Sequence, residues 1–173
     1  MKEYAGKVRV VYKNMVVHPQ VVMKGHLAGC AASKQGKFLE FKHEWWDKAY
    51  APYAAARDPS KLGEENIMAI AKDLKLDTAK FKADMDSEDC QKRVNGDMQE
   101  LAKWKVNSTP SFFINGKVFR WSGDPSSFKT EIDADIKQVE ASGVPCADYY
   151  EKKVIGEGEK QFRSKKDPKP AGK

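Results

Sequence analysis

Hydrophobic residues recur every three or four positions through the middle of this chain, which is the spacing of one helix face. Ile67, Ile70, Ala71 and Leu74 fall at i, i+3, i+4 and i+7, so they predict a helix that buries one apolar side. Ser60 is the residue expected to cap that helix. Similar patterns predict helices over 21–35 and 37–50, a short helix capped by Asp77, and a longer one opened by Ser87 with one apolar face of Val94, Met98, Leu101 and Ala102. They also predict a helix over 147–155 and one that starts at Asp124-Pro125, with a buried face of Phe128, Ile132, Ile136 and Val139.

Strand-like patterns occur near the beginning of the chain and again after Pro110. Residues 7–13 are rich in β-branched side chains that alternate with polar ones, which predicts a strand. Residues 111–114 and 117–121 flank Asn115-Gly116, a dipeptide typical of a two-residue β-hairpin turn. Pro110 cannot donate a hydrogen bond to a sheet, so it must lie at the start of the hairpin.

The predicted order is a strand, about five helices, two antiparallel strands and further helices, which indicates the α/β class. The 173 residues suit one domain, which we place at 1–155. A helical block at about 20–106 is expected as an insertion between the first strand and the hairpin. Residues 163–173 carry five basic groups and two prolines, so we expect a basic, disordered tail over 156–173.

Composition excludes several classes of function. The net charge of +6 lies partly in the tail, and we interpret it as solubilising, with no nucleic-acid partner. No run approaches the roughly 20 apolar residues of a membrane span. The start of the chain does not resemble a signal peptide, so the sequence leaves the compartment unknown. His18, His26 and His43 are too scattered to predict a metal site, and no cofactor motif occurs.

The chain has three cysteines, Cys30, Cys90 and Cys146. No pair has the spacing of a metal-ligand or redox motif. An odd number leaves at least one thiol free in a monomer. The residues leave two alternatives: three buried or idle thiols, or a structural disulfide between Cys30 and Cys90. Spacing does not decide between them, because it does not place the Cα atoms.

Three segments, in this order, resemble the DsbA-like branch of the thioredoxin-fold thiol–disulfide oxidoreductases. Residues 8–19 are similar to the strand that follows the family's active-site helix. Residues 28–40 are similar to its helical junction, and 108–116 (Ser-Thr-Pro-Ser-Phe-Phe-Ile-Asn-Gly) to its cis-proline hairpin. The resemblance covers about residues 5–140. It implies protein thiol or peptide substrates and, for exported members, the bacterial periplasm or cell envelope.

In that family a strand and a helix that opens with Cys-x-x-Cys precede the counterpart of residues 7–13. These 173 residues contain no Cys-x-x-Cys, so we expect an incomplete thioredoxin-like fold and a redox-inactive chain with no catalytic residue. Disulfide exchange needs an attacking thiolate and a resolving thiol, and both are lost together. By the resemblance, Cys30 occupies a packing position in the helical insertion.

The resemblance also makes Ser108, Thr109 and Pro110 the candidate substrate-binding loop, whose backbone pairs with an extended peptide. Two interpretations of Pro110 stay open. It is either a docking edge of a non-catalytic, chaperone-like module, or a cis-proline that serves only the geometry of the hairpin.

The absent strand would lie between 7–13 and 111–114, and unpaired buried strand edges are costly. Three outcomes are open. The strand over 7–13 closes directly on the hairpin, a second copy pairs by strand exchange or along the edge to give a homodimer, or the natural protein is longer. We favour the first two.

Overall fold

The computed structural model describes residues 2–160 and 162, and the chain divides into two compact units. The helical unit consists of Lys13–Glu100, and the hairpin unit combines Met1–Tyr12 with Leu101–Lys173. The domain expected over 1–155 is therefore divided between two units. The helical unit has bounds close to those of the insertion expected at about 20–106.

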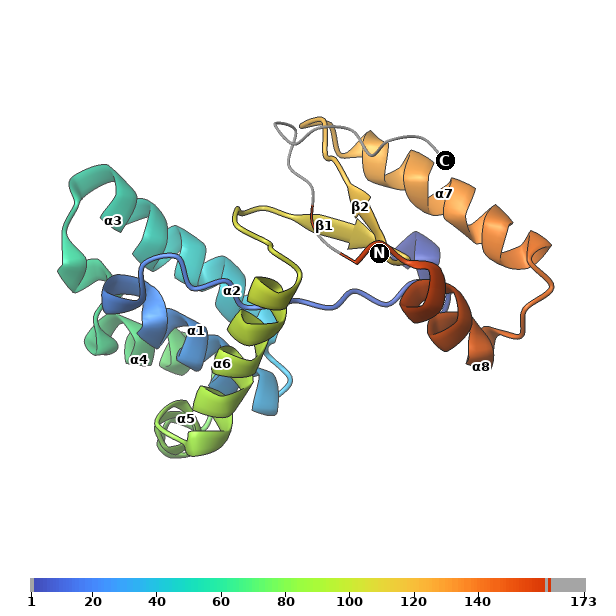
Figure 1. The fold of residues 1–173 in the computed structure, drawn as a ribbon. Coiled ribbons are helices and arrows are strands. Elements are labelled where there is room, and N and C mark those ends of the chain that lie inside the picture. Colours follow the sequence, from blue (N-terminus) through green and yellow to red (C-terminus); the bar gives the residue numbers. More distant parts are fainter. Residues whose placement is uncertain (1, 161, 163–173) are drawn as a thin grey trace. The chain divides into compact units, whose positions relative to one another are not determined.

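The helical unit is built from short helices with tight connections (Figure 1). Most of them coincide with the patterns of apolar residues seen in the sequence. Its elements are α1 (Pro19–Lys34), α2 (Phe38–Trp45), the π-helical turn η2 (Trp46–Tyr50), α3 (Ala51–Ala56), the 3-10 turn η3 (Pro59–Leu62), α4 (Glu64–Asp73), α5 (Thr78–Met85) and α6 (Glu88–Lys103), whose last residues belong to the hairpin unit.

The helix starts were predicted with mixed success. The Asp77 side chain accepts a hydrogen bond from the Lys80 backbone N–H, so it caps α5 as expected. Ser60 does not cap α4, and that prediction was wrong. Asp58 caps the turn η3 instead, because Pro59 suits the first position of a helical turn, and α4 begins only after the extended Gly63.

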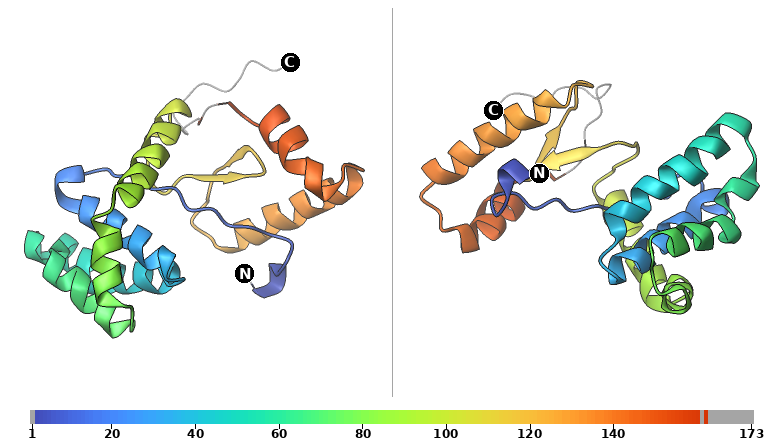
Figure 2. Two further views of the ribbon diagram at one scale, coloured as in Figure 1. Left: turned by 90° about the horizontal axis from the view of Figure 1, so that it is seen from below. Right: turned by 180° about the vertical axis from the view of Figure 1, so that it is seen from behind.

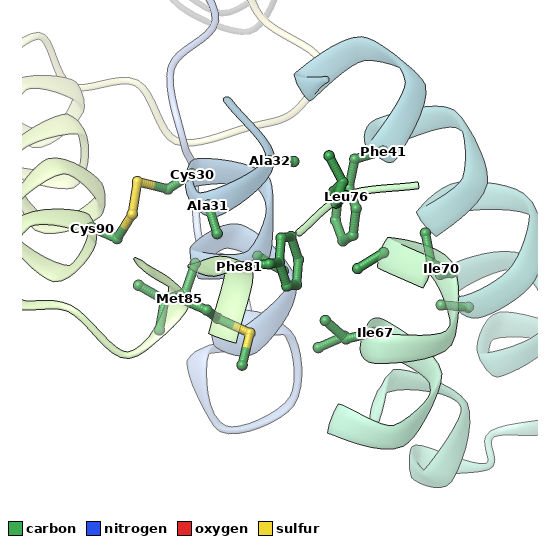
Figure 3. Close-up of a cluster of buried hydrophobic side chains, with 14 of the residues drawn as sticks. Cys30, Ala31, Ala32, Phe41, Ile67, Ile70, Leu76, Phe81, Met85 and Cys90 are labelled. Atoms are coloured by element: carbon green, nitrogen blue, oxygen red, sulfur yellow. A yellow bond between two sulfur atoms is a disulfide. The ribbon is translucent and has the colours of Figure 1, made fainter. Parts of the chain in front are cut away.

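The core of the helical unit gathers around Phe81, which is fully buried (Figure 3). Its ring lies 5.6 Å from the ring of Phe41, measured between centroids. Ile67 and Ile70, the predicted apolar face of α4, are also fully buried. Each such side chain stabilises the fold by about 1.5–3 kcal/mol through removal of apolar surface from water.

The hairpin unit contains a two-stranded antiparallel sheet, β1 (Phe112–Ile114) and β2 (Lys117–Phe119). Phe112 lies opposite Phe119, and Phe113 lies opposite Val118. Asn115 and Gly116 both have positive φ, at 44° and 80°, which a two-residue hairpin turn of this hand requires. The predicted hairpin is confirmed.

Helix α7 (Ser126–Ala141) lies along the hairpin in every view (Figures 1 and 2). Phe128 packs edge-on against Phe112, with 4.9 Å between ring centroids, and also contacts Phe119 and Trp121. The predicted buried face of α7 (Phe128, Ile132, Ile136 and Val139) is only partly buried, because a two-stranded sheet is too small to cover a long helix. Asp135 is the buried residue of α7.

The N-terminal strand prediction was wrong. Residues 7–13 belong to no strand, and the sheet of the described residues consists of β1 and β2 alone. A strand forms only where another segment pairs with it, and β-branched composition does not supply a partner. Val10, Val11 and Tyr12 are exposed as a result. The short 3-10 turn η1 (Lys2–Tyr4) comes before this segment and contacts α7, where the Tyr4 hydroxyl donates to Asp133.

The end of the chain continues beyond α7 with α8 (Cys146–Tyr149) and the π-helical turn η4 (Tyr150–Ile155), close to the helix predicted over 147–155. The disordered tail expected over 156–173 stays a prediction, although its first part has specific contacts. Glu159 and Phe162 make hydrogen bonds to the hairpin unit. Residues 161 and 163–173 lie outside the described part of the chain.

Candidate functional site

The loop Ser108–Pro110 lies between the end of α6 and the beginning of β1. The Thr109–Pro110 peptide bond is cis, and all three residues are exposed. The Ser111 hydroxyl donates to the carbonyl oxygen of Ser108 at 2.6 Å, which closes the loop on itself. The sequence-predicted binding residues are therefore together, at the surface and next to a strand.

The outer edge of β1 continues this loop. In the observed register Phe113 and Val118 form a non-hydrogen-bonded pair, so the backbone N–H and C=O of Phe113 point away from β2. Within residues 2–160 and 162, these two groups of Phe113 have no backbone partner. An exposed edge of this kind can accept hydrogen bonds from, and donate them to, an added strand.

Two of the three cysteines belong to the helical unit, whereas this loop belongs to the hairpin unit. Cys30 of α1 and Cys90 of α6 form a disulfide within the helical unit, with Cα atoms 5.7 Å apart (Figure 3). Of the two alternatives that the sequence left open, the structure has the disulfide. Both residues are buried, at 5% and 0% exposure. Cys146, at the start of α8, is an exposed free thiol.

A polar cluster around the buried Asp97 of the helical unit was not predicted. The Asp97 carboxylate accepts from the Asn14 backbone N–H at 3.0 Å and from the Asn14 side-chain amide at 2.7 Å. The Lys13 ammonium lies 3.2 Å from Asp97 and 2.6 Å from Glu100. These contacts raise the pKa of Lys13, with the hydrogen bond to Glu100 as the largest cause. The cluster connects the first residues of the helical unit in sequence, Lys13 and Asn14, with its last ones, Asp97 and Glu100.

His26 completes this cluster from α1. Its Nδ1 lies 3.0 Å from the Asn14 side-chain oxygen. Because the Asn14 amide nitrogen already donates to Asp97, this oxygen accepts, and Nδ1 carries a proton. Burial lowers the pKa of His26, and attraction to Asp97 partly opposes that change. Helical spacing gave no signal for these contacts, since Asn14 lies in a loop and Asp97 lies on a helix face expected to be apolar.

We expect the lowered pKa of His26 to make the helical unit less stable in acid. The unfolded chain takes up a proton near the ordinary value of 6.5, whereas the folded chain resists it. Stability that is present above pH 6.5 is therefore lost as the pH falls below that value. Urea unfolding at pH 7.5 and 5.5 measures the effect. The variant His26→Asn should show a smaller difference between the two pH values, and an equal difference would contradict this cause.

The described residues show no metal centre, since no three of their His, Cys, Asp or Glu side chains are arranged to hold an ion. Nor does any helix within 2–160 combine the length and apolar character needed to cross a bilayer. Asp135 is the remaining unusual group. One of its carboxylate oxygens is buried and has no hydrogen-bond partner in this part of the chain.

Comparison with known proteins adds the family. Residues 1–134 match the family described as Thioredoxin. The chain is 30% identical over 138 residues to the probable disulfide bond formation protein D of Bacillus cereus, an alignment that covers 77% of this chain and 60% of that protein. It is 32% identical over 79 residues to the protein of the same name from Bacillus anthracis, covering 44% and 36% of the two chains.

A third relative is of another kind. The chain is 27% identical over 142 residues to the Na(+)/H(+) antiporter NhaA of Herminiimonas arsenicoxydans, across 82% of this chain but 21% of that protein. The chain therefore spans only part of the length of these relatives. No solved structure matches the chain.

The match over most of the chain shows that this protein belongs to the thioredoxin family. Within that family, the similarity to disulfide bond formation proteins supports the DsbA-like group that the sequence motifs indicated. The α/β, thioredoxin-like fold class is likewise confirmed, with a small sheet and many helices.

Proposed function

We propose that these 173 residues form a DsbA-like domain that does not exchange disulfides by itself. The observation that carries this proposal is the state of the cysteines. Cys30 and Cys90 are bonded to each other and buried, and Cys146 is a single exposed thiol. Neither arrangement supplies an accessible pair of thiols.

The chemistry explains why such a pair matters. Oxidation of a substrate dithiol begins when a substrate thiolate attacks one sulfur atom of an accessible disulfide. This forms a mixed disulfide, and the other sulfur atom of the attacked disulfide leaves as a thiolate. The second substrate thiolate then attacks the mixed disulfide, so that two electrons pass to the protein. A buried disulfide shields both sulfur atoms from the first attack. A lone thiol such as Cys146 can form a mixed disulfide but has no neighbouring thiol to resolve it.

A dithiol-oxidation assay tests this proposal. We expect the chain to oxidise a reduced model peptide no faster than buffer alone, and to reduce insulin no faster than dithiothreitol alone. The matched control is the triple variant Cys30→Ala, Cys90→Ala, Cys146→Ala, which should behave in the same way. Turnover above the buffer rate that the triple variant lacks would refute the proposed inactivity.

A second candidate function is non-catalytic, chaperone-like binding of extended protein segments. The exposed loop Ser108–Pro110 and the outer edge of β1 favour it, because a peptide can add to this edge as a strand. Affinity then comes from backbone hydrogen bonds and needs no thiol. Binding of an unfolded, alkylated polypeptide that persists in the triple cysteine variant would support this function.

A second copy of the chain is the other partner we propose for that edge. Residues 8–12 lie outside any helix or strand and are strand-forming in composition, with exposed Val10 and Val11, so they suit pairing with β1 of another molecule. This gives a homodimer by strand exchange or edge pairing, which competes with peptide docking. Light scattering measures the mass, and a monomer at every concentration would exclude the dimer.

A buried disulfide also fits a protein that folds in an oxidising compartment, such as the bacterial cell envelope.

A further inference from the structure

The chain continues past the part that matches the family. The match ends at residue 134, whereas α8, η4 and the residues after them lie beyond it. We call Gly158, Glu159, Lys160 and Phe162 the strap. All four are described, and their contacts lie within the hairpin unit.

The first part of the strap covers the edge of β2. The Glu159 backbone N–H donates to the carbonyl oxygen of Gly116 at 2.7 Å. The Glu159 carboxylate accepts from the backbone N–H of Val118 at 3.2 Å. Val118 N–H points away from β1 in the hairpin register, so this carboxylate occupies the place of a neighbouring strand.

The second part of the strap reaches the side of the candidate docking loop. The Phe162 backbone N–H donates to the carbonyl oxygen of Trp104 at 2.7 Å, a few residues before Ser108. The Phe162 ring lies 6.1 Å from the ring of Phe113, measured between centroids. Phe113 is the residue whose backbone forms the open edge of β1. The strap thus contacts both β2 and the strand that borders the loop.

The close contact between strap and turn depends on two glycines. A Cβ atom on Gly158 would lie 2.2 Å from the carbonyl oxygen of Val154 and 3.0 Å from that of Gly116. A Cβ atom on Gly116 would lie 3.0 Å from the Cα of Gly158. Neither residue can carry a side chain while the strap lies where it does. The turn and the strap therefore fit each other as a specific contact between segments 42 residues apart in the sequence.

We infer that the strap is an intramolecular competitor for peptides that dock at Ser108–Pro110 and β1, an inference that rests on the peptide-binding function proposed above. A peptide added to the β1 edge places alternate side chains on the Phe113 face, where the Phe162 ring already lies. The strap must leave that face before the peptide packs against it. The association constant measured for a peptide is then the intrinsic constant multiplied by the fraction of molecules in which the strap is released.

Two variants of the 173-residue chain test the strap from different directions. Gly158→Ala displaces it through the clash with Val154, and Phe162→Ala removes the ring that covers Phe113. The control is Lys152→Ala, which removes an exposed ion pair with Asp148 on the same C-terminal extension. Each protein is titrated with a fluorescently labelled insulin B chain whose cysteines are carbamidomethylated. We expect both strap variants to bind about tenfold more tightly than the wild type and the control.

Hydrogen exchange measures the strap independently of any ligand. In the wild type, the amides of Val118 and Phe162 should exchange slowly, and Gly158→Ala should speed both. Fast exchange of both amides in the wild type would overturn the strap itself. Equal affinities in all four proteins, with slow wild-type exchange, would overturn the competition but leave peptide binding intact. Absence of binding even in strap-released variants would overturn the peptide-binding function and the competition with it.

Discussion

Loss of the Cys30–Cys90 disulfide is expected to lower the free energy of unfolding by about 4 kcal/mol. The bond closes a loop of 60 residues in sequence separation, and a long loop restricts the unfolded chain strongly. It also joins α1 to α6 inside the core of the helical unit, next to fully buried alanines of α1. A loss of that size is a large share of the stability of a small domain.

Urea unfolding of the variant Cys30→Ala, Cys90→Ala against the wild type measures this loss. Alanine is used because the site is buried and a serine hydroxyl would need a partner. The matched control is Cys146→Ala, whose thiol is exposed and unpaired, so its stability should change by less than about 0.5 kcal/mol. Dithiothreitol should destabilise the wild type and leave the double variant unaffected. A double variant as stable as the wild type would show that the bond does not hold the unit together.

Much of the fold was accessible to sequence reasoning because local rules decide it. The apolar face of α4 and the Asp77 cap of α5 are set by residues within a few positions of each other. The Asn115-Gly116 turn is equally local, since both residues adopt positive φ without help from elsewhere. Helices and tight turns of this kind depend little on distant parts of the chain.

The errors have a different origin. Residues 7–13 have the composition of a strand, but a strand needs a partner, and the described residues supply none. The face of α7 was expected to be buried, but its exposure depends on how much sheet lies beneath it. The composition of the tail likewise gave no sign of the specific contacts that Glu159 and Phe162 make. In each case a non-local contact decides the outcome.

The features of the candidate site also separate into those that the local sequence predicts and those that depend on distant residues. Ser108, Thr109 and Pro110 were predicted from a local motif, and the structure places all three at the surface, although their role in binding stays a prediction. The Cys30–Cys90 bond stayed an alternative, because nothing local places two residues 60 positions apart. The sequence signal for the strap was the segment Gly156-Glu157-Gly158, which follows a helix. Glycines often mark a close approach of two backbones.

The Asp97 cluster was missed for a related reason, and its removal is the second large effect we expect. In Asp97→Ala, the Asn14 backbone N–H and side-chain amide both lose their acceptor, and the Lys13 ammonium loses one of its two carboxylate partners. The two Asn14 donors are partly buried, and leaving such donors unpaired costs about 1–3 kcal/mol. We therefore expect a loss of about 2 kcal/mol in the free energy of unfolding.

The control for this variant is Glu100→Ala. Glu100 pairs with the same Lys13 ammonium, but its side chain is 49% exposed, so its removal should cost less than about 1 kcal/mol. Urea unfolding gives both values, and hydrogen exchange of the Asn14 amide reports the local contact. If Asp97→Ala and Glu100→Ala destabilise the chain equally, the burial of Asp97 has no special role. A much larger loss for Asp97→Ala means that Asp97 holds Lys13 and Asn14, the first residues of the helical unit, against α6. The secondary-structure propensities of Lys13 and Asn14 do not supply this contact.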